Sequence, residues 1–181
     1  RVGGPVHVVG HDWGAVVAWT LALRRPDLVR TVTAVSVPHP TAFLRALVTS
    51  LQLLRSWYML LFQLPRLPEL VARRRGGFFD RSLERAGMTA EERARCRAEV
   101  LDYGALPGAL GWYRALPFAD RSLTGAKVTV PTTLVWSDGD IALGRKGAEL
   151  TERYVAAPYR FVELRDVSHW IPTQAPEACA F

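Results

Sequence analysis

The chain has 181 residues and a formal charge of +6, and this length is sufficient for one domain with a hydrophobic core. Nearly all basic residues are arginines. Two short clusters, Arg73–Arg75 and the set Arg93, Arg95 and Arg97, lie beside acidic residues, which predicts solvated helix faces rather than a nucleic-acid-binding stripe. The two cysteines, Cys96 and Cys179, lie far apart without metal-ligand spacing, so we expect free thiols in a reducing compartment.

The first 40 residues alternate between strand and helix patterns. Val6–Val9 is rich in β-branched residues and bounded by glycine, which predicts a buried strand. Residues 13–23 are mostly Ala, Val, Leu and Trp and end before Pro26, as a buried helix would. Residues 31–37 are again β-type. This β–α–β order predicts parallel strands with a right-handed crossover.

Asp12 lies between the first strand and the first helix, in the sequence Gly10-His-Asp-Trp-Gly14. The same frame, with serine at its centre, is the nucleophile elbow, a strained turn that exposes one side chain at the end of a strand. Glycines at 10 and 14 are expected where a Cβ would collide with the turn or the helix. A carboxylate is ionised at neutral pH and is suited to attack on a saturated carbon. The pattern therefore predicts a nucleophile, with an ordinary turn as the alternative.

The middle of the chain, residues 41–123, has a helical pattern and few β-type residues. It contains residues 42–61, an Arg- and Glu-rich stretch around residues 88–101, and residues 106–116. This composition predicts an inserted helical cap between two parts of an α/β core, which would occupy residues 1–40 and 124–181.

The α/β pattern returns after residue 124. Strands are expected over residues 127–136 and 159–164, with a helix over residues 144–155 between them and a terminal helix after them. Asp140 follows the first of these strands and His169 the second. Because ligands bind at the carboxyl ends of strands in open α/β sheets, we expect Asp12, Asp140 and His169 at one edge. Asp138 is interpreted as part of the turn with Gly139.

The order of nucleophile, acid and histidine is that of the α/β-hydrolase triad. With these motifs the chain resembles the epoxide hydrolase and haloalkane dehalogenase branch of the α/β-hydrolases, and most closely the soluble epoxide hydrolases. The resemblance covers essentially all 181 residues. It implies a mostly parallel sheet, of which about four strands are present here, with an inserted cap. The segments around Tyr58 and Tyr113 resemble the two cap segments whose tyrosines hold the epoxide oxygen in that family.

The resemblance implies that Asp12 forms an alkyl-enzyme ester with an epoxide and that His169, supported by Asp140, activates the water that hydrolyses it to a diol. The backbone N–H of Trp13 is expected to stabilise the oxyanion, and His11 to line the site. No metal or cofactor is required, and the expected partners are a small apolar epoxide and water, without nucleic acid. A haloalkane dehalogenase and a non-catalytic hydrolase-fold fragment remain as alternatives. The oligomeric state is not predicted.

The ends of the chain bear on completeness and location. The chain opens with Arg1, residues 173–181 resemble a helix cut short, and the family's upstream His-Gly-x-Pro turn and further strands are absent. We therefore expect a piece of a larger protein that is weakly active by itself, since an oxyanion donor is missing. No signal peptide and no run of about 18 apolar residues is present, which predicts a cytoplasmic location without a membrane span.

Overall fold

The computed structural model describes residues 3–179, which form two compact units. The first unit comprises the chain up to Arg55 and from Arg121 onward, and the second is Ser56–Asp120. Residues between 41 and 55, which the sequence analysis assigned to the cap, group with the first unit, because the helix Pro40–Thr49 packs against the helix Arg145–Thr151. No helix within residues 3–179 has the length and apolar character needed to cross a membrane.

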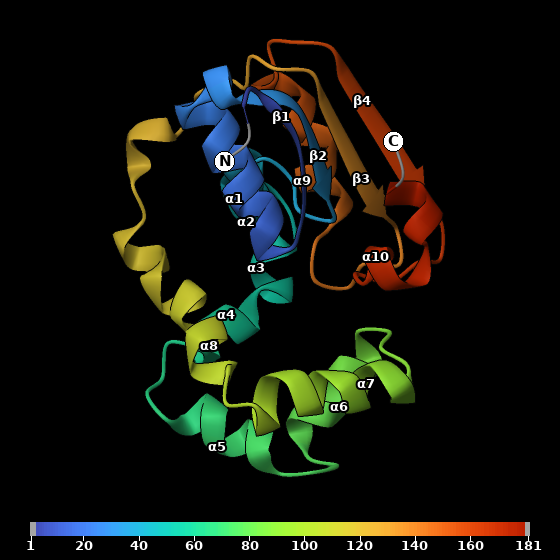
Figure 1. Cartoon of the computed structure of the whole chain (residues 1–181). Coiled ribbons are helices and arrows are strands. Elements are labelled where there is room, and N and C mark those ends of the chain that lie inside the picture. Colours follow the sequence, from blue (N-terminus) through green and yellow to red (C-terminus); the bar gives the residue numbers. More distant parts are fainter. Residues whose placement is uncertain (1–2, 180–181) are drawn as a thin grey trace. The chain divides into compact units, whose positions relative to one another are not determined.

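The first unit is built on a sheet of four parallel strands in the order β1-β2-β3-β4 (Figure 1). The strands are β1 (Val6–His11), β2 (Val29–Val35), β3 (Thr132–Ser137) and β4 (Tyr159–Leu164). Each strand pairs with the next in parallel, so all four carboxyl ends lie at the same edge. The predicted α/β class and the expected number of strands are confirmed.

Helices connect and cover these strands, and they are α1 (Trp13–Arg24), α2 (Pro40–Thr49), α3 (Gln52–Arg55), α9 (Arg145–Thr151) and α10 (Ile171–Gln174). Short 3₁₀ turns lie at Pro26–Leu28, Arg121–Leu123, Glu152–Tyr154 and Pro176–Cys179. The expected terminal helix is therefore a short α-helix followed by a 3₁₀ turn, and its last two residues lie outside the described part of the chain.

The two faces of the sheet form separate hydrophobic clusters, because successive side chains of a strand point to opposite faces. On one face Leu134 and Trp136 of β3 pack with α1 residues such as Trp19, which is fully buried. On the other face Val135 packs with Ile171 of α10. Two indole N–H groups buried on the first of these faces are satisfied, since Trp19 donates to the carbonyl of Val37 and Trp136 to that of Leu143.

The second unit is entirely helical, and its elements are α4 (Trp57–Leu61), α5 (Leu67–Arg73), α6 (Phe78–Arg85), α7 (Ala90–Cys96), a π-helical turn at Arg97–Asp102, α8 (Leu106–Ala115) and a 3₁₀ turn at Leu116–Phe118 (Figure 1). Helix α7 begins with a capping box, in which Thr89 and Glu92 each accept the backbone N–H of the other. The stretch 42–61, expected to be helical, lies within three helices, with breaks at Ser50-Leu51 and at Ser56.

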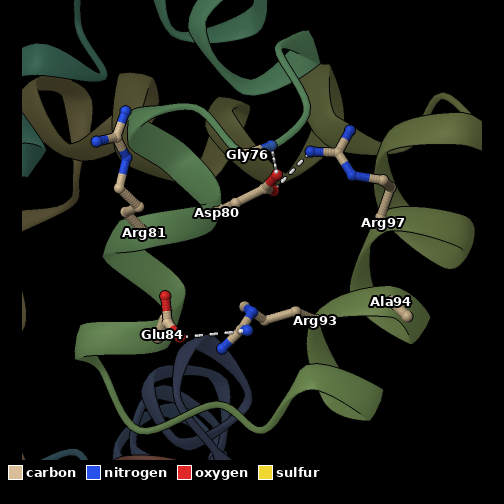
Figure 2. Close-up of a pocket in the computed structure, with 7 residues that line it drawn as sticks. All are labelled: Gly76, Asp80, Arg81, Glu84, Arg93, Ala94 and Arg97. Carbon is tan, nitrogen blue, oxygen red and sulfur yellow. Dashed lines mark hydrogen bonds and ion pairs between the residues drawn. The ribbon is translucent and has the colours of Figure 1, made fainter.

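Charged residues join α6 to α7 and the π-helical turn in the second unit. Arg97 donates to Asp80 over 2.6 Å, and Arg93 lies 3.4 Å from Glu84. These pairs line a pocket of about 390 Å³, where Figure 2 shows both arginines directed toward the carboxylates of α6. The Arg97 side chain is only 12% exposed. The interpretation of this cluster as a solvated helix face is therefore wrong for Arg97, because its charge is neutralised by Asp80.

Candidate active site

Asp12 occupies a strained turn between β1 and α1. Its φ is 50°, in the left-handed region that non-glycine residues seldom adopt. Its backbone carbonyl accepts the N–H of Ala15 at 2.9 Å, so the turn leads directly into the helix. The side chain of Asp12 is 41% exposed. The local conformation of a nucleophile elbow, with its central side chain displayed, is therefore present.

The two glycines of this turn have different roles. A Cβ on Gly10 would lie 2.2 Å from the carbonyl oxygen of Gly14, a contact that the backbone has no room for. A Cβ on Gly14 would meet no atom within 4 Å apart from its chain neighbours and the backbone of its own helix. The expected collision is thus present at Gly10, whereas for Gly14 the expectation was wrong, because that position faces open space on the first turn of α1.

Asp140 lies in the loop after β3 and is almost completely buried. One carboxylate oxygen accepts the backbone N–H groups of Ala142 and Leu143 at 2.8 and 2.9 Å. The other lies 2.7 Å from Nδ1 of His169. The backbone carbonyl of Asp140 also accepts a hydrogen bond from Arg55 at 3.0 Å. The acid is thus held through both its side chain and its backbone.

His169 lies between two carboxylates. Its Nδ1 faces Asp140, and its Nε2 is 3.5 Å from a carboxylate oxygen of Asp12. The side chain is 8% exposed. The structure therefore brings together the three side chains that the sequence assigned to one edge of the sheet, and it does so from the ends of β1, β3 and β4.

The charges of this group are strongly coupled. Burial lowers the pKa of His169, but hydrogen bonds and charge interactions with Asp12 and Asp140 outweigh burial and raise it to about 10. Burial raises the pKa of Asp12, whereas its hydrogen bond with His169 and the charge of that ring lower it, and the net shift is downward. At neutral pH the resting ring of His169 is therefore an imidazolium beside Asp12 and Asp140.

The loops that carry Asp140 and His169 are joined to each other. The carboxylate of Asp138 accepts the N–H of Asp166 at 2.8 Å, and Ser137 Oγ accepts that of Val167 at 3.2 Å. A Cβ on Gly139 would lie 2.5 Å from the carbonyl oxygen of Val167, which shows how closely the loops approach. Asp138 therefore does more than shape its own turn.

The other predicted site residues lie as follows. His11 is adjacent to His169, with ring centroids 5.0 Å apart. The backbone N–H of Trp13 forms a hydrogen bond with the carboxyl group of Asp12, which helps to lower its pKa. Tyr58 and Tyr113 lie together in the second unit, with ring centroids 6.0 Å apart and Phe62 packed against both.

Two residues near the site were not identified as site residues from the sequence. Arg55 gives no signal, because it lies 85 residues from Asp140 in the sequence and no local pattern indicates their contact. Ser36 follows β2 at the same sheet edge as the three predicted residues, and it is fully buried with a φ of 67°. The predicted strand ran to Val37 and so placed Ser36 inside it, whereas β2 ends at Val35.

The parallel sheet, the elbow and the three side chains at its edge are those of an α/β-hydrolase. The chain belongs to the alpha/beta hydrolase family, whose model matches residues 1–180. Within it the chain is epoxide hydrolase-like: it is 34% identical over 181 residues to Epoxide hydrolase 3 of Xenopus tropicalis, a match that covers 94% of this chain and 49% of that protein. It is also 36% identical over 180 residues to the AB hydrolase superfamily protein YfhM of Bacillus subtilis, covering 93% and 61%.

Solved structures give the same result. Epoxide Hydrolase A from Mycobacterium thermoresistibile superposes with a TM-score of 0.70 at 29% identity, covering 98% of this chain and 67% of that one. An epoxide hydrolase of Bacillus megaterium in complex with an inhibitor gives 0.78 at 25% identity, covering 96% and 66%. The chain thus spans about half to two thirds of the length of the proteins it resembles.

Proposed function

We propose that this chain carries the catalytic group of an enzyme that opens epoxides to vicinal diols through an ester on Asp12. The observation that carries the proposal is the position of His169, which lies within reach of Asp12 on one side and of buried Asp140 on the other. The similarity to epoxide hydrolases supports the substrate class.

In the first half-reaction an Asp12 carboxylate oxygen attacks an epoxide carbon. A bond forms between that oxygen and the carbon, and the bond from the carbon to the epoxide oxygen breaks. Asp12 is suited to this step because its lowered pKa keeps it ionised and its side chain is partly exposed. The oxygen that departs develops alkoxide charge and needs hydrogen-bond donors.

We assign these donors to Tyr58 and Tyr113, because a phenol can donate to the alkoxide and protonate it. The resemblance of their segments to the family's cap supports this assignment. Their packing against each other within one helical unit is consistent with a shared role. We accordingly propose that the second unit belongs to a cap, for which the sequence analysis suggested residues 41–123.

In the second half-reaction the loss of one charge activates the histidine. Once Asp12 is an ester it no longer stabilises the imidazolium of His169, so the pKa of His169 falls, the ring releases its Nε2 proton to solvent, and the neutral ring can act as a base. His169 takes a proton from water, and the water oxygen attacks the carbonyl carbon of the ester. The Trp13 N–H, already bonded to this carboxyl group, stabilises the oxyanion of the tetrahedral intermediate. The bond from the Asp12 carbonyl carbon to the alkyl oxygen then breaks, that oxygen takes the remaining proton of the water, and the diol leaves with Asp12 again a carboxylate.

The experiment is a single turnover of the full-length protein in ¹⁸O-labelled water with an aryl epoxide such as styrene oxide. The first diol should contain unlabelled oxygen from Asp12, and mass spectrometry of the peptide that contains Asp12 should then show the label in its carboxylate. Asp12→Asn should abolish the burst of diol formation, because a neutral amide is a poor nucleophile. Label that appears directly in the first diol would refute the ester, and halide release from a haloalkane without diol formation would favour a dehalogenase.

A further inference from the structure

The backbone carbonyl of His169 receives two hydrogen bonds from side chains of neighbouring strands. His11, the last residue of β1, places Nε2 at 2.8 Å from this oxygen. Ser36, the first residue after β2, donates its hydroxyl to the same oxygen at 2.9 Å. The two donors are adjacent because His11 pairs with Val35 in the sheet register. We call this pair of hydrogen bonds the carbonyl clamp.

The chemistry of each donor fits this contact. A carbonyl oxygen only accepts hydrogen bonds, so the proton of His11 must be on Nε2. Burial and the adjacent charge of His169 lower the pKa of His11, which keeps its ring neutral with a single N–H. The Nε2–H of His11 therefore donates its hydrogen bond to the backbone carbonyl of His169.

Ser36 has an unusual backbone for its residue type. With a φ of 67° it is in the left-handed region, which glycine adopts without strain and serine does not. Its side chain is fully buried, and its hydroxyl donates to the carbonyl of His169. The hydroxyl is the part of this residue that glycine would lack, so the strained serine supplies a contact that the unstrained residue could not.

We propose that His11 and Ser36 are positioning residues for His169, and that the carbonyl clamp sets the reach of its ring for the hydrolysis of the Asp12 ester. This inference rests on the proposed function. The ring has to meet Asp140 through Nδ1 and the site of Asp12 through Nε2, and both distances depend on where the backbone of His169 lies. The ring of Trp170 packs edge-on against the ring of His169, with centroids 5.3 Å apart, and so contacts the side chain of His169 rather than its backbone.

The effect should fall on one half-reaction. Formation of the ester needs Asp12 and the donors to the epoxide oxygen, and it requires no proton transfer by His169. Breakdown of the ester needs His169 in position to take a proton from water. A displacement of about 1 Å at a reacting group lowers rates by roughly a hundredfold, so loss of the clamp should slow breakdown by about tenfold to a hundredfold.

The test uses the full-length protein with Ser36→Gly, which removes the hydroxyl and relieves the strained φ, and with Ser36→Ala, which removes the hydroxyl and retains the strain. In single turnover both variants should accumulate the Asp12 ester, with formation retained and hydrolysis slowed. Ser36→Gly should unfold at no lower a denaturant concentration than Ser36→Ala. Slow hydrolysis in both variants, whatever their relative stabilities, supports positioning; hydrolysis at the wild-type rate in both would overturn the proposal.

The His11 side of the clamp has a matched pair of variants. His11→Gln keeps an N–H donor near the place of Nε2, whereas His11→Leu removes it. Hydrolysis should be slow in His11→Leu and restored to within about fivefold of wild type in His11→Gln, since the donor is the part that matters. Equal hydrolysis rates in the two variants would contradict a role for the Nε2 proton.

One further readout separates failure of the clamp from failure of the proposed function. In the resting protein the Nδ1 proton of His169, bonded to Asp140, should give a sharp low-field NMR signal that broadens in Ser36→Gly. An unchanged signal would overturn the clamp without any substrate being involved. Absence of the ester in the wild-type protein would instead refute the proposed function, whatever the NMR signal does.

Discussion

His39 is fully buried in the first unit, between the rings of Trp19 and Tyr154. Its Nδ1 accepts the backbone N–H of Thr41 and caps the first turn of α2. The neutral ring therefore carries its proton on Nε2, which has no hydrogen-bond partner among the described residues. Burial lowers the pKa of His39 from 6.5 to about 4, because an imidazolium here would be desolvated without a carboxylate.

This lowered pKa predicts that His39 makes the protein less stable in acid. The group is a base whose folded pKa is below its unfolded pKa, so its contribution is fully present above pH 6.5 and is lost as the pH falls toward 4. One proton contributes a slope of up to about 1.4 kcal/mol per pH unit in that range. Urea unfolding at several pH values would measure it.

His39→Asn is the matched control, since asparagine can accept the same capping hydrogen bond and does not titrate. The acid carboxyl groups, Asp12 among them, titrate in both proteins, so the difference between the two slopes belongs to His39. Equal slopes between pH 6.5 and 4 would show that the buried ring is not protonated on unfolding in that range.

At the scale of single elements, the ends of the strands concentrate unusual backbone geometry. Asp12 follows β1, Ser36 follows β2 and Asp166 lies shortly after β4, and each has a positive φ. Strained residues of this kind cost about 1–3 kcal/mol each and persist where the surrounding structure holds them. Their presence at one edge of the sheet agrees with the position of the candidate site there.

The elbow gives a prediction with an internal control. Gly10→Ala should destabilise the protein by about 1–3 kcal/mol and reduce display of Asp12, because its Cβ would collide with the backbone of Gly14. Gly14→Ala should be neutral or stabilising by up to about 1 kcal/mol, since its Cβ meets open space on a helix. Denaturant unfolding of both variants checks this; equal losses of stability would show that the turn tolerates either change alike.

The sequence predicted the elements that have strong local patterns. Residues 159–164 form a strand with the expected bounds, and the first helix ends within a residue of its expected end. The strand expected from residue 127 begins at Thr132, because Pro131 has no N–H to donate to a sheet ladder. Residues 42–61 look continuous by composition, yet Ser50 receives the N–H of Gln52 and ends α2.

The candidate site likewise has contacts that the sequence predicts and contacts that it does not. Asp12, Asp140 and His169 could be predicted to meet, because strand order and the carboxyl edge of a parallel sheet determine where they lie. The contact of Ser36 with His169 could not, since it depends on whether β2 ends at Val35 or Val37 and on a left-handed φ. Arg55 reaches the Asp140 carbonyl from a distant part of the chain, and no local pattern encodes such a contact.

At the scale of the whole molecule, the two units differ in their cores. The first unit has two clusters of buried side chains around its sheet. In the second unit, which lies wholly within the described residues, the buried apolar side chains are Pro68, Ala72 and Leu110. Ion pairs such as Asp80 with Arg97 join its helices instead. Apolar burial is the larger source of stability, so the second unit should open more easily.

Hydrogen exchange under native conditions would measure this difference. Backbone amides of α5 to α8 should exchange with a smaller opening free energy than those of β2 and β3, and the amides of α1 provide a helical control from the first unit. If α8 were protected as strongly as α1, the helical unit would unfold only together with the sheet. That outcome would contradict its description as the weaker unit.

The junction between the Asp138 and Asp166 loops has a consequence for engineering. Side-chain hydrogen bonds and the close approach at Gly139 join the two loops. The loops that carry Asp140 and His169 should therefore be exchanged together when parts of related proteins are combined. The nucleophile, on its own strand-to-helix turn, is a separate part. A chimera that exchanges residues 137–140 without residues 164–169 would combine loops from different parents and lose their alignment. Recombination between related hydrolases should therefore place its crossovers between Gly14 and the start of β3, and never between β3 and His169.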